Sequence, residues 1–312
     1  MTTTEGALDM GRMDEKRREL RQGLEGSDAL TAVGAHDAMS ARLIEQNGFD
    51  AVWVSGFGVS TMTHAVPDLN LVTMSEALAA AVRIDSATTL PVVADCDNGF
   101  GGLGNVVRTV REYERAGIAG ICIEDNLFPK RNSLLDDSVL RDLIPVDDQA
   151  SRIAAGKAAQ EDPQFVFIAR VEALIAGHGV AEACKRADAY VEAGADAILI
   201  HSRDKSLQEI TAFLDQWRGV GTVPLVAVPT LFPSFSTARL SEMGFRLVIF
   251  ANQAMRAAIS SMEATLAALA EHRRADAVDG DIAPLDHVFD LVGTREAIEA
   301  EAAAYRREPL PQ

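Results

Sequence analysis

The sequence predicts an α/β fold with eight parallel strands, and two observations support this class. Short, β-branched apolar runs alternate with longer helical stretches along the 312 residues, and no Pro/Gly/Ser-rich linker divides the chain. The eight runs equal the number of strands in a (β/α)8 barrel. A doubly wound open sheet would give similar alternation, so the periodicity alone leaves the closure of the sheet open.

Each expected strand is one of these short apolar runs. In chain order they cover residues 30–33, 51–55, 91–95, 120–124, 166–170, 197–201, 225–228 and 247–250. A glycine that fits the left-handed position at the end of a helix stands shortly before every second run, namely Gly48, Gly117, Gly194 and Gly244. An unbroken succession of helices and strands would place such glycines in this regular way.

The chain is expected to form three segments. An N-terminal helical segment covers residues 1–26, the barrel covers 27–273, and a C-terminal helical extension covers 274–312. A helix at about 253–273 follows the last strand, and a further helical stretch runs over 285–306 after a polar break. This extension is too long to be only the last barrel helix, so we expect it to pack on a neighbouring subunit.

Composition excludes several classes of partner. The net charge of −17 argues against nucleic acid or an anionic membrane, because both require a basic surface. Residues 1–13 lack an apolar signal core, and no run approaches the length of a membrane span. The three cysteines, Cys96, Cys122 and Cys184, lack metal-binding spacing and fit a reduced, cytoplasmic setting. We therefore expect a soluble protein whose partner is a small molecule.

Polar residues gather where the expected strands end. Ser55, Asp95 and Glu124 close the second, third and fourth runs, and Arg170 and His201 close the fifth and sixth. In a parallel barrel all these ends emerge on one face, so the side chains would converge on one mouth. The alternative is that each strand simply ends in a polar residue. Five chemically complementary groups at five ends favour a site.

Carboxylates in two of these positions predict a metal site. Asp95 and Asp97 are two residues apart in an extended segment, so both side chains can point the same way. With Glu124 they form a set of hard oxygen ligands that suits Mg²⁺. Two solvated aspartates in a loop are the simpler alternative.

The cationic residues predict an anion clamp. Arg170 offers paired donors to phosphate or carboxylate oxygens, and His201 can donate to the same group or move a proton. Glu172 is expected to orient the arginine. The turn from Ser55 to Phe57, with Gly56 between them, has backbone N–H groups that could hold a carboxylate or an enolate oxygen.

Together these residues resemble the phosphoenolpyruvate mutase/isocitrate lyase superfamily, from about Gly34 to Arg256. The matching motifs are Ser55-Gly56-Phe57, Asp68, Asp95-x-Asp97-x-Gly99-Phe100-Gly101, Glu124-Asp125, Pro129-Lys130-x-Asn132-Ser133, Arg170-Val171-Glu172-Ala173, His201-Ser202, Val228-Pro229-Thr230 and Asn252. The resemblance implies Mg²⁺ held by Asp95, with Asp68, Asp97 and Glu124 acting largely through waters. It also implies a homo-oligomer, dimer or tetramer, in which the last barrel helix is exchanged between subunits.

The loop after Glu124 separates the branches of this superfamily. Its lyases carry a catalytic cysteine in a Lys-Arg-Cys-Gly-His motif, whereas this chain has Lys130-Arg131-Asn132-Ser133-Leu134. The resemblance therefore disfavours a carbon–carbon lyase. Asn132 matches the Pro-Lys-x-Asn-Ser motif of the mutases rather than the Pro-Lys-x-Thr-Ser motif of phosphonopyruvate hydrolases.

The resemblance thus implies a phosphoenolpyruvate mutase that forms the carbon–phosphorus bond of phosphonate biosynthesis. The implied catalytic residues are Asp68, Lys130, Asn132, Arg170 and His201. The implied substrate-binding residues are Ser55, Gly56, Phe57, Ser133, Leu134 and Asn252. The alternatives are a hydrolase that releases pyruvate and phosphate, and a non-catalytic barrel that binds a keto acid. Asn98, Gly102 and Asn126 depart from the residues common in the family.

Overall fold

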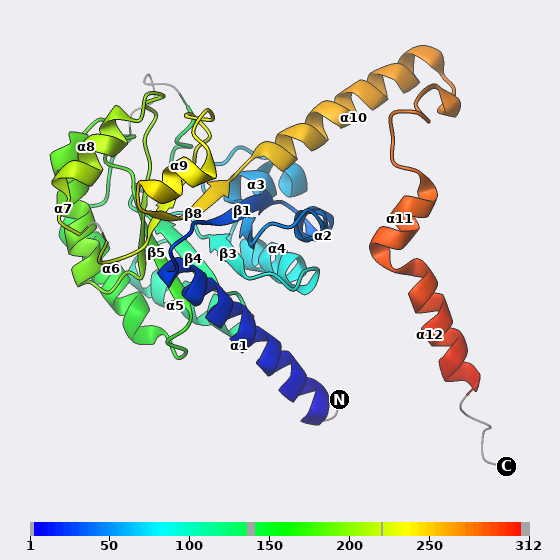
Figure 1. Ribbon diagram of the computed structural model, residues 1–312, viewed down its shortest axis with the longest axis horizontal. Coiled ribbons are helices and arrows are strands. Elements are labelled where there is room, and N and C mark those ends of the chain that lie inside the picture. The colour runs from blue at the N-terminus through cyan, green and yellow to red at the C-terminus, as the bar shows by residue number, and fades with distance from the viewer. Residues whose placement is uncertain (1–2, 136–140, 220, 307–312) are drawn as a thin grey trace. The chain divides into compact units, whose positions relative to one another are not determined.

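The computed structural model describes residues 3–135, 141–219 and 221–306, and its centre is a closed parallel barrel. The barrel contains eight strands in chain order, and β8 pairs with β1 to close it (Figure 1). The predicted (β/α)8 class is therefore confirmed. The strands are β1 (Leu30–Ala35), β2 (Ala51–Val54), β3 (Val92–Asp95), β4 (Gly120–Glu124), β5 (Val166–Val171), β6 (Ala197–Ile200), β7 (Leu225–Ala227) and β8 (Phe245–Phe250).

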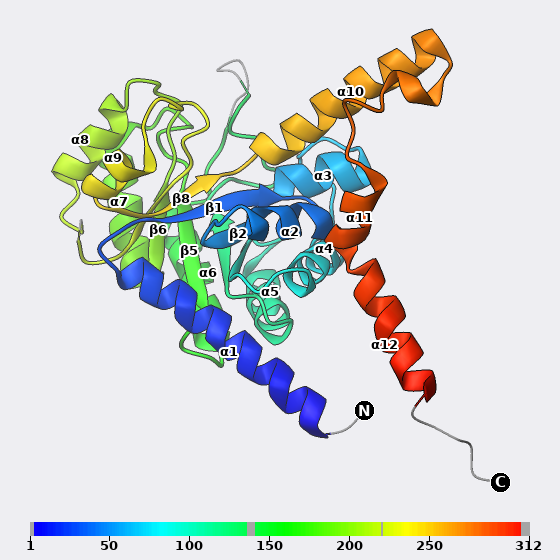
Figure 2. The same ribbon diagram turned by 45° about the vertical axis from the view of Figure 1, so that its right-hand side comes forward.

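Helices alternate with these strands along the chain. They are α1 (Thr3–Glu25), α2 (Ala38–Gln46), α3 (Gly56–His64), α4 (Met74–Ser86), α5 (Leu103–Arg115), α6 (Val146–Ala159), α7 (Gly179–Glu192), α8 (Gln208–Gln216), α9 (Thr237–Glu242), α10 (Gln253–His272), the 3₁₀ turn η1 (Ala275–Ala277), α11 (Leu285–Val292) and α12 (Thr294–Arg306). The helices from α2 to α9 surround the barrel (Figures 1 and 2). None of the described helices is both long and apolar enough to cross a membrane.

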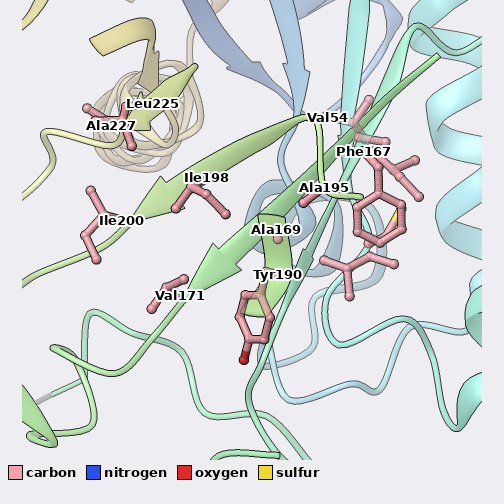
Figure 3. Packing of buried hydrophobic residues seen from close by; sticks show 14 of the residues in the cluster. Val54, Phe167, Ala169, Val171, Tyr190, Ala195, Ile198, Ile200, Leu225 and Ala227 are labelled. Atoms are coloured by element: carbon pink, nitrogen blue, oxygen red, sulfur yellow. The ribbon is translucent and has the colours of Figure 1, made fainter. Parts of the chain in front are cut away.

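Strand alternation divides the buried residues into two cores. One fills the barrel interior, with members such as Trp53, Ile168 and Leu247, and includes Leu20 and Leu24 of α1. The other lies between the strands and the surrounding helices, as Figure 3 illustrates around β5, β6 and α7. Successive residues of a strand face opposite sides of the sheet, so each strand supplies both cores.

The N-terminal helix α1 is held to the barrel by buried charged groups as well as by these leucines. Lys16 Nζ lies 2.7 Å from Asp85 Oδ1 of α4, and Arg17 Nε donates to the carbonyl of Ile118 at 3.2 Å. Both cations are almost fully buried. Because a buried charge is tolerated only with a partner, these contacts fix where α1 lies on the barrel.

The chain divides into two compact units, Met1–Met255 and Arg256–Gln312. The first contains the barrel, and the second carries apolar side chains such as Leu266, Leu285 and Tyr305 that are largely exposed. The division predicted at residues 26 and 273, and the exchange of the last barrel helix between subunits, stay predictions.

Candidate active site

The polar residues at the strand ends converge because they continue the rows of side chains that fill the barrel interior. In β5, Val166 and Ile168 lie inside the barrel, and Arg170 is the next member of that row. In β4, Cys122 places Glu124 in the same way. The same alternation applies to the other predicted strand ends, Ser55, Asp95 and His201. Figures 1 and 2 together label the strands that end at or just before these residues.

A pocket lies at this mouth. The predicted residues that line it are Ser55, Phe57, Asp68, Asp95, Glu124, Lys130, Asn132, Ser133, Leu134, Arg170, His201 and Asn252. The other two, Gly56 and Asp97, lie behind Asp95 and do not line this pocket. Trp53 and Ala251 also line it, although as apolar residues they gave no sequence signal of function, and the remaining lining residues are Arg131, Val228 and Thr230.

One side of the pocket is a group of carboxylates around the ammonium of Lys130. Lys130 Nζ lies 2.8 Å from Asp68 Oδ1 and contacts Asp97 Oδ1, and all three side chains are almost fully buried. Among the described residues, no three His, Cys, Asp or Glu side chains are grouped as direct ligands of a metal ion. An arrangement with Asp95 as the direct ligand and other carboxylates acting through waters does not require such a group.

The donor set nevertheless fits a hard divalent cation. Glu124 Oε1 is buried and has no hydrogen-bond partner within the described residues. Burial raises the pKa of Glu124 to about 8, despite the charges of Arg170 and Lys130, and it raises the pKa of Asp97 to about 6, despite Lys130. A Cβ atom on Gly56 would come within 3.3 Å of Asp95 Oδ2, so glycine keeps the space beside this carboxylate open. Buried oxygens without enough positive charge are what Mg²⁺ would satisfy.

The predicted anion clamp lies next to Glu124, whose Oε2 is 3.5 Å from Arg170 Nη1, and the carboxylate of Glu172 holds the clamp together. Glu172 Oε1 accepts from Arg170 Nε and lies 3.1 Å from His201 Nδ1. Glu172 Oε2 accepts from the Ser133 hydroxyl at 2.8 Å. Arg170 Nη2 also donates to Ser133 Oγ at 2.7 Å and lies 3.0 Å from His201 Nδ1. The expectation that Glu172 orients the arginine is confirmed.

Electrostatics keep the members of the clamp in defined charge states. Burial opposes the ionisation of Glu172, but the charge of Arg170 and several hydrogen bonds hold the pKa of that carboxyl below its usual range. Burial and the neighbouring guanidinium both lower the pKa of His201, which favours the neutral imidazole. When Nδ1 accepts from Arg170, Nε2 carries the proton and can donate to an anion in the pocket.

Part of the chain between β4 and α6 lines the pocket, and we call its described residues, 127–135 and 141–143, the lid loop. Its base is closed by the bridge between Asn126 and Leu143, while residues 136–140 lie outside the described part of the chain. Asn132 Nδ2 donates to Asp68 Oδ2 at 2.8 Å, and its Oδ1 accepts from the N–H of Leu134 at 2.9 Å. These two bonds turn the donor end of the Asn132 amide toward Asp68.

Asn70 links the lid loop to the carboxylate group, and the sequence analysis missed it. Its Oδ1 accepts from the Lys130 N–H at 2.6 Å, and its Nδ2 donates to Asp97 Oδ2 at 3.1 Å. Asn70 has a φ of 60°, a left-handed conformation that asparagine tolerates better than most residues. The only signal in the sequence was an asparagine two residues after Asp68 in a loop.

The expected turn after β2 is the beginning of a helix. Ser55 is the N-cap of α3, and its hydroxyl accepts from the Gly58 N–H at 3.0 Å. Gly56 and Phe57 form the first turn, where N–H groups have no partner inside the helix and can bind an anion. On the far wall, Asn252 Nδ2 donates to Thr230 Oγ1 at 3.2 Å.

Comparison with known proteins places the chain in one family. Residues 20–270 match the family described as phosphoenolpyruvate phosphomutase. A phosphonopyruvate hydrolase of Variovorax sp. (strain Pal2) is 42% identical over 290 residues, which cover 92% of this chain and 98% of the relative. The crystal structure of a phosphoenolpyruvate phosphomutase from Streptomyces platensis subsp. rosaceus is also 42% identical, with a TM-score of 0.88 and coverage of 92% and 98%.

The structure of a third similar protein contains a bound ligand and a metal ion. It is a phosphonopyruvate hydrolase crystallised in complex with oxalate and Mg²⁺, with 40% identity, a TM-score of 0.85, and coverage of 92% of this chain and 98% of that one. Overall identity thus does not separate the mutases from the hydrolases. The chain belongs to the phosphoenolpyruvate phosphomutase family, and it is an enzyme of the phosphoenolpyruvate mutase/isocitrate lyase superfamily.

Proposed function

We propose that this enzyme is a Mg²⁺-dependent phosphoenolpyruvate mutase, which interconverts phosphoenolpyruvate and phosphonopyruvate. The observation that carries the proposal is Asn132, whose amide presents its donor end beside Asp68. In that orientation the amide can hold a phosphoryl oxygen, but its own acceptor atom is already used by Leu134. It therefore offers little to orient a water for attack.

The residues divide the substrate between the two sides of the pocket. The first turn of α3 would hold the carboxylate and enolate oxygens of the pyruvate part. Bound Mg²⁺, held by Asp95 and through waters by Asp68, Asp97 and Glu124, would stabilise the negative charge of the enolate. During a dissociative transfer, the phosphoryl group would be held by Arg170, His201 and Asn132.

The lid loop has two tasks in this scheme. Lys130 would offset negative charge near the transferred group, and Ser133 and Leu134 would help to close the pocket over it. A mutase must return the phosphoryl group to pyruvate before water attacks it, so closure has to exclude solvent. The Ser133 hydroxyl contacts both Arg170 and Glu172, which supports a closed loop that docks on the clamp.

Hydrolysis of phosphonopyruvate is the second candidate, because a phosphonopyruvate hydrolase is 42% identical to this chain. Phosphorus NMR of the purified protein with Mg²⁺ and phosphonopyruvate separates the two. Growth of a phosphoenolpyruvate signal without free phosphate is the expected result. Phosphate and pyruvate would instead identify a hydrolase, and an unchanged spectrum would favour the keto-acid binding barrel.

We also propose that the protein is a homo-oligomer. Leu266, Leu285 and Tyr305 in the C-terminal unit expose most of their apolar surface, which supports a contact with another copy of the chain. Light scattering after size-exclusion chromatography should give a dimer or tetramer, and a monomeric mass would contradict this proposal. The cytoplasmic location stays a prediction.

A further inference from the structure

Three polar side chains form a buried group behind the clamp, and the proposed chemistry does not use them. Asp125 follows Glu124 at the end of β4, while Arg186 and Tyr190 lie one turn apart on α7. Asp125 and Tyr190 are fully buried and Arg186 is 5% exposed. None of the three lines the pocket, so none can touch the substrate directly.

The contacts of this group lead to the main chain of Glu172. Asp125 Oδ2 accepts from Arg186 Nη1 at 2.9 Å and from the Tyr190 hydroxyl at 2.7 Å. Its other oxygen, Oδ1, accepts from the backbone N–H of Glu172 at 2.9 Å. Arg186 and Tyr190 therefore fix the carboxylate of Asp125, and that carboxylate fixes the chain at the residue that organises the clamp.

The same group also holds the end of the lid loop. The N–H of Ile144 donates to the Asp125 carbonyl at 2.8 Å, and the Ile144 carbonyl accepts from Arg186 Nη1 at 3.0 Å. Ile144 directly follows the bridge that closes the base of this loop. One buried cluster thus fixes two points on the main chain, one beneath the clamp and one beneath the lid loop.

Burial of these groups is costly, and this points to a role beyond stability. A buried ion pair is commonly no more stable than apolar side chains of the same volume, because both charges lose their hydration. Tyr190 already lies in an apolar cluster with Phe167 and Ala195 (Figure 3). A cluster that served packing alone would not need Asp125 and Arg186 there. Both Asp125 oxygens are instead used to fix groups in one geometry.

We propose that Asp125, Arg186 and Tyr190 are positioning residues that fix the main chain of Glu172 and thereby the phosphoryl clamp. Through its side chain Glu172 sets the places of Arg170, His201 and Ser133. A shift of that main chain by a fraction of an ångström would move all three, and catalysis is sensitive to such displacements. The inference rests on the proposed function, since it assumes that the clamp holds a phosphoryl group.

The test compares ligands with and without a phosphoryl group. Tyr190→Phe removes one hydroxyl and keeps the packing of the ring, and Asp125→Asn keeps the shape but removes the charge. Glu182→Gln is the matched control, because Glu182 Oε1 accepts from Arg186 Nε at 2.9 Å on the side of the guanidinium away from Asp125. For each protein, calorimetry gives the affinity for phosphonopyruvate and for oxalate with Mg²⁺, and steady-state kinetics gives kcat and KM.

We expect Tyr190→Phe to weaken phosphonopyruvate binding and to lower kcat/KM by about 3- to 10-fold. Asp125→Asn should have the same two effects, with a size of about 100-fold. Oxalate has no phosphoryl group, so its affinity should stay within about twofold of the wild-type value in Tyr190→Phe and in the control. Equal weakening of both ligands would mean a merely structural role and would overturn the proposal. If Tyr190→Phe has the wild-type affinity and the wild-type kcat/KM for phosphonopyruvate, the proposal is overturned as well.

The design keeps this inference separate from the proposed function. If Asp125→Asn does not fold, Tyr190→Phe carries the test alone. A wild-type protein that releases phosphate would end the mutase proposal, yet the comparison of ligands would still decide the positioning role. A wild-type protein that neither binds nor converts phosphonopyruvate would overturn both.

Discussion

Replacing Asn132 with threonine tests whether the lid amide protects the phosphoryl group from water. Asn132 Nδ2 reaches Asp68 Oδ2 at 2.8 Å, and the N–H of Leu134 holds the amide in that orientation at 2.9 Å. The threonine hydroxyl is too short to span this distance, so the variant loses a hydrogen bond to a charged group. Such a bond contributes about 1.5–3 kcal/mol. Because Asn132 is only half-buried, we take the lower value, which corresponds to about a tenfold slower mutase reaction.

The shorter side chain should also open a path for hydrolysis. The threonine side chain does not reach the position that Asn132 Nδ2 occupies beside Asp68, so a water molecule can take that place. Asp68 loses the Asn132 donor and can accept a hydrogen bond from that water, while the threonine hydroxyl can orient it. We therefore expect Asn132→Thr to release phosphate from phosphonopyruvate in addition to forming phosphoenolpyruvate.

Phosphorus NMR time courses with Mg²⁺ and phosphonopyruvate give the ratio of the two products directly. Leu127→Ala is the matched control, because Leu127 lies on the same loop but is 45% exposed and does not line the pocket. A product ratio in Asn132→Thr equal to that of the wild-type protein would refute the reasoning. The same change of ratio in both variants would assign the effect to the loop as a whole.

Three further changes test other parts of the site and fold. Asp95→Ala should abolish turnover and Mg²⁺-dependent oxalate binding, and calorimetry that finds unchanged oxalate affinity would contradict the assignment of the metal ligand. Asn70→Gly removes the link to Lys130 without straining a φ of 60°, and should raise KM by about tenfold; an unchanged KM in steady-state assays would remove Asn70 from the site. Lys16→Met removes the ammonium that lies 2.7 Å from Asp85, and should lower the free energy of unfolding by about 3 kcal/mol in urea titrations. A loss below about 1 kcal/mol would mean that this buried pair contributes little.

The fold could be predicted from local signals, except for the closure of the sheet. The apolar runs located all eight strands to within about two residues, and glycines stand shortly before four of them. Closure depends on the pairing of β1 with β8, where Thr31 aligns with Val248. No local pattern records a pairing between segments so far apart. The helix after Ser55 was expected only as a turn, because its glycines and β-branched residues give it a low intrinsic helix propensity.

The residues of the site were predictable where the alternation of side chains along a strand sets the direction in which a side chain points. Arg170 and Glu124 follow from the alternation within β5 and β4, so sequence alone placed them at the mouth. Asn70 was missed because its role arises only where a loop meets Lys130 and Asp97. The contacts of Asp125 were missed for the same reason, since they depend on two side chains of α7 that are about 60 residues away.

The balance of charge in the pocket explains why the affinity for the substrate and the affinity for the metal should depend on each other. The lining carries three carboxylates and three cations, and two further buried carboxylates, those of Asp97 and Glu172, lie directly behind it. An anionic substrate would therefore enter a site that already has excess negative charge, in a protein with a net charge of −17. Mg²⁺ would reverse this balance on the side of Glu124, where a buried oxygen has no partner among the described residues. By linkage, each ligand must then raise the affinity of the other by the same factor. The loss of Asp95 should consequently appear in oxalate affinity as well as in turnover.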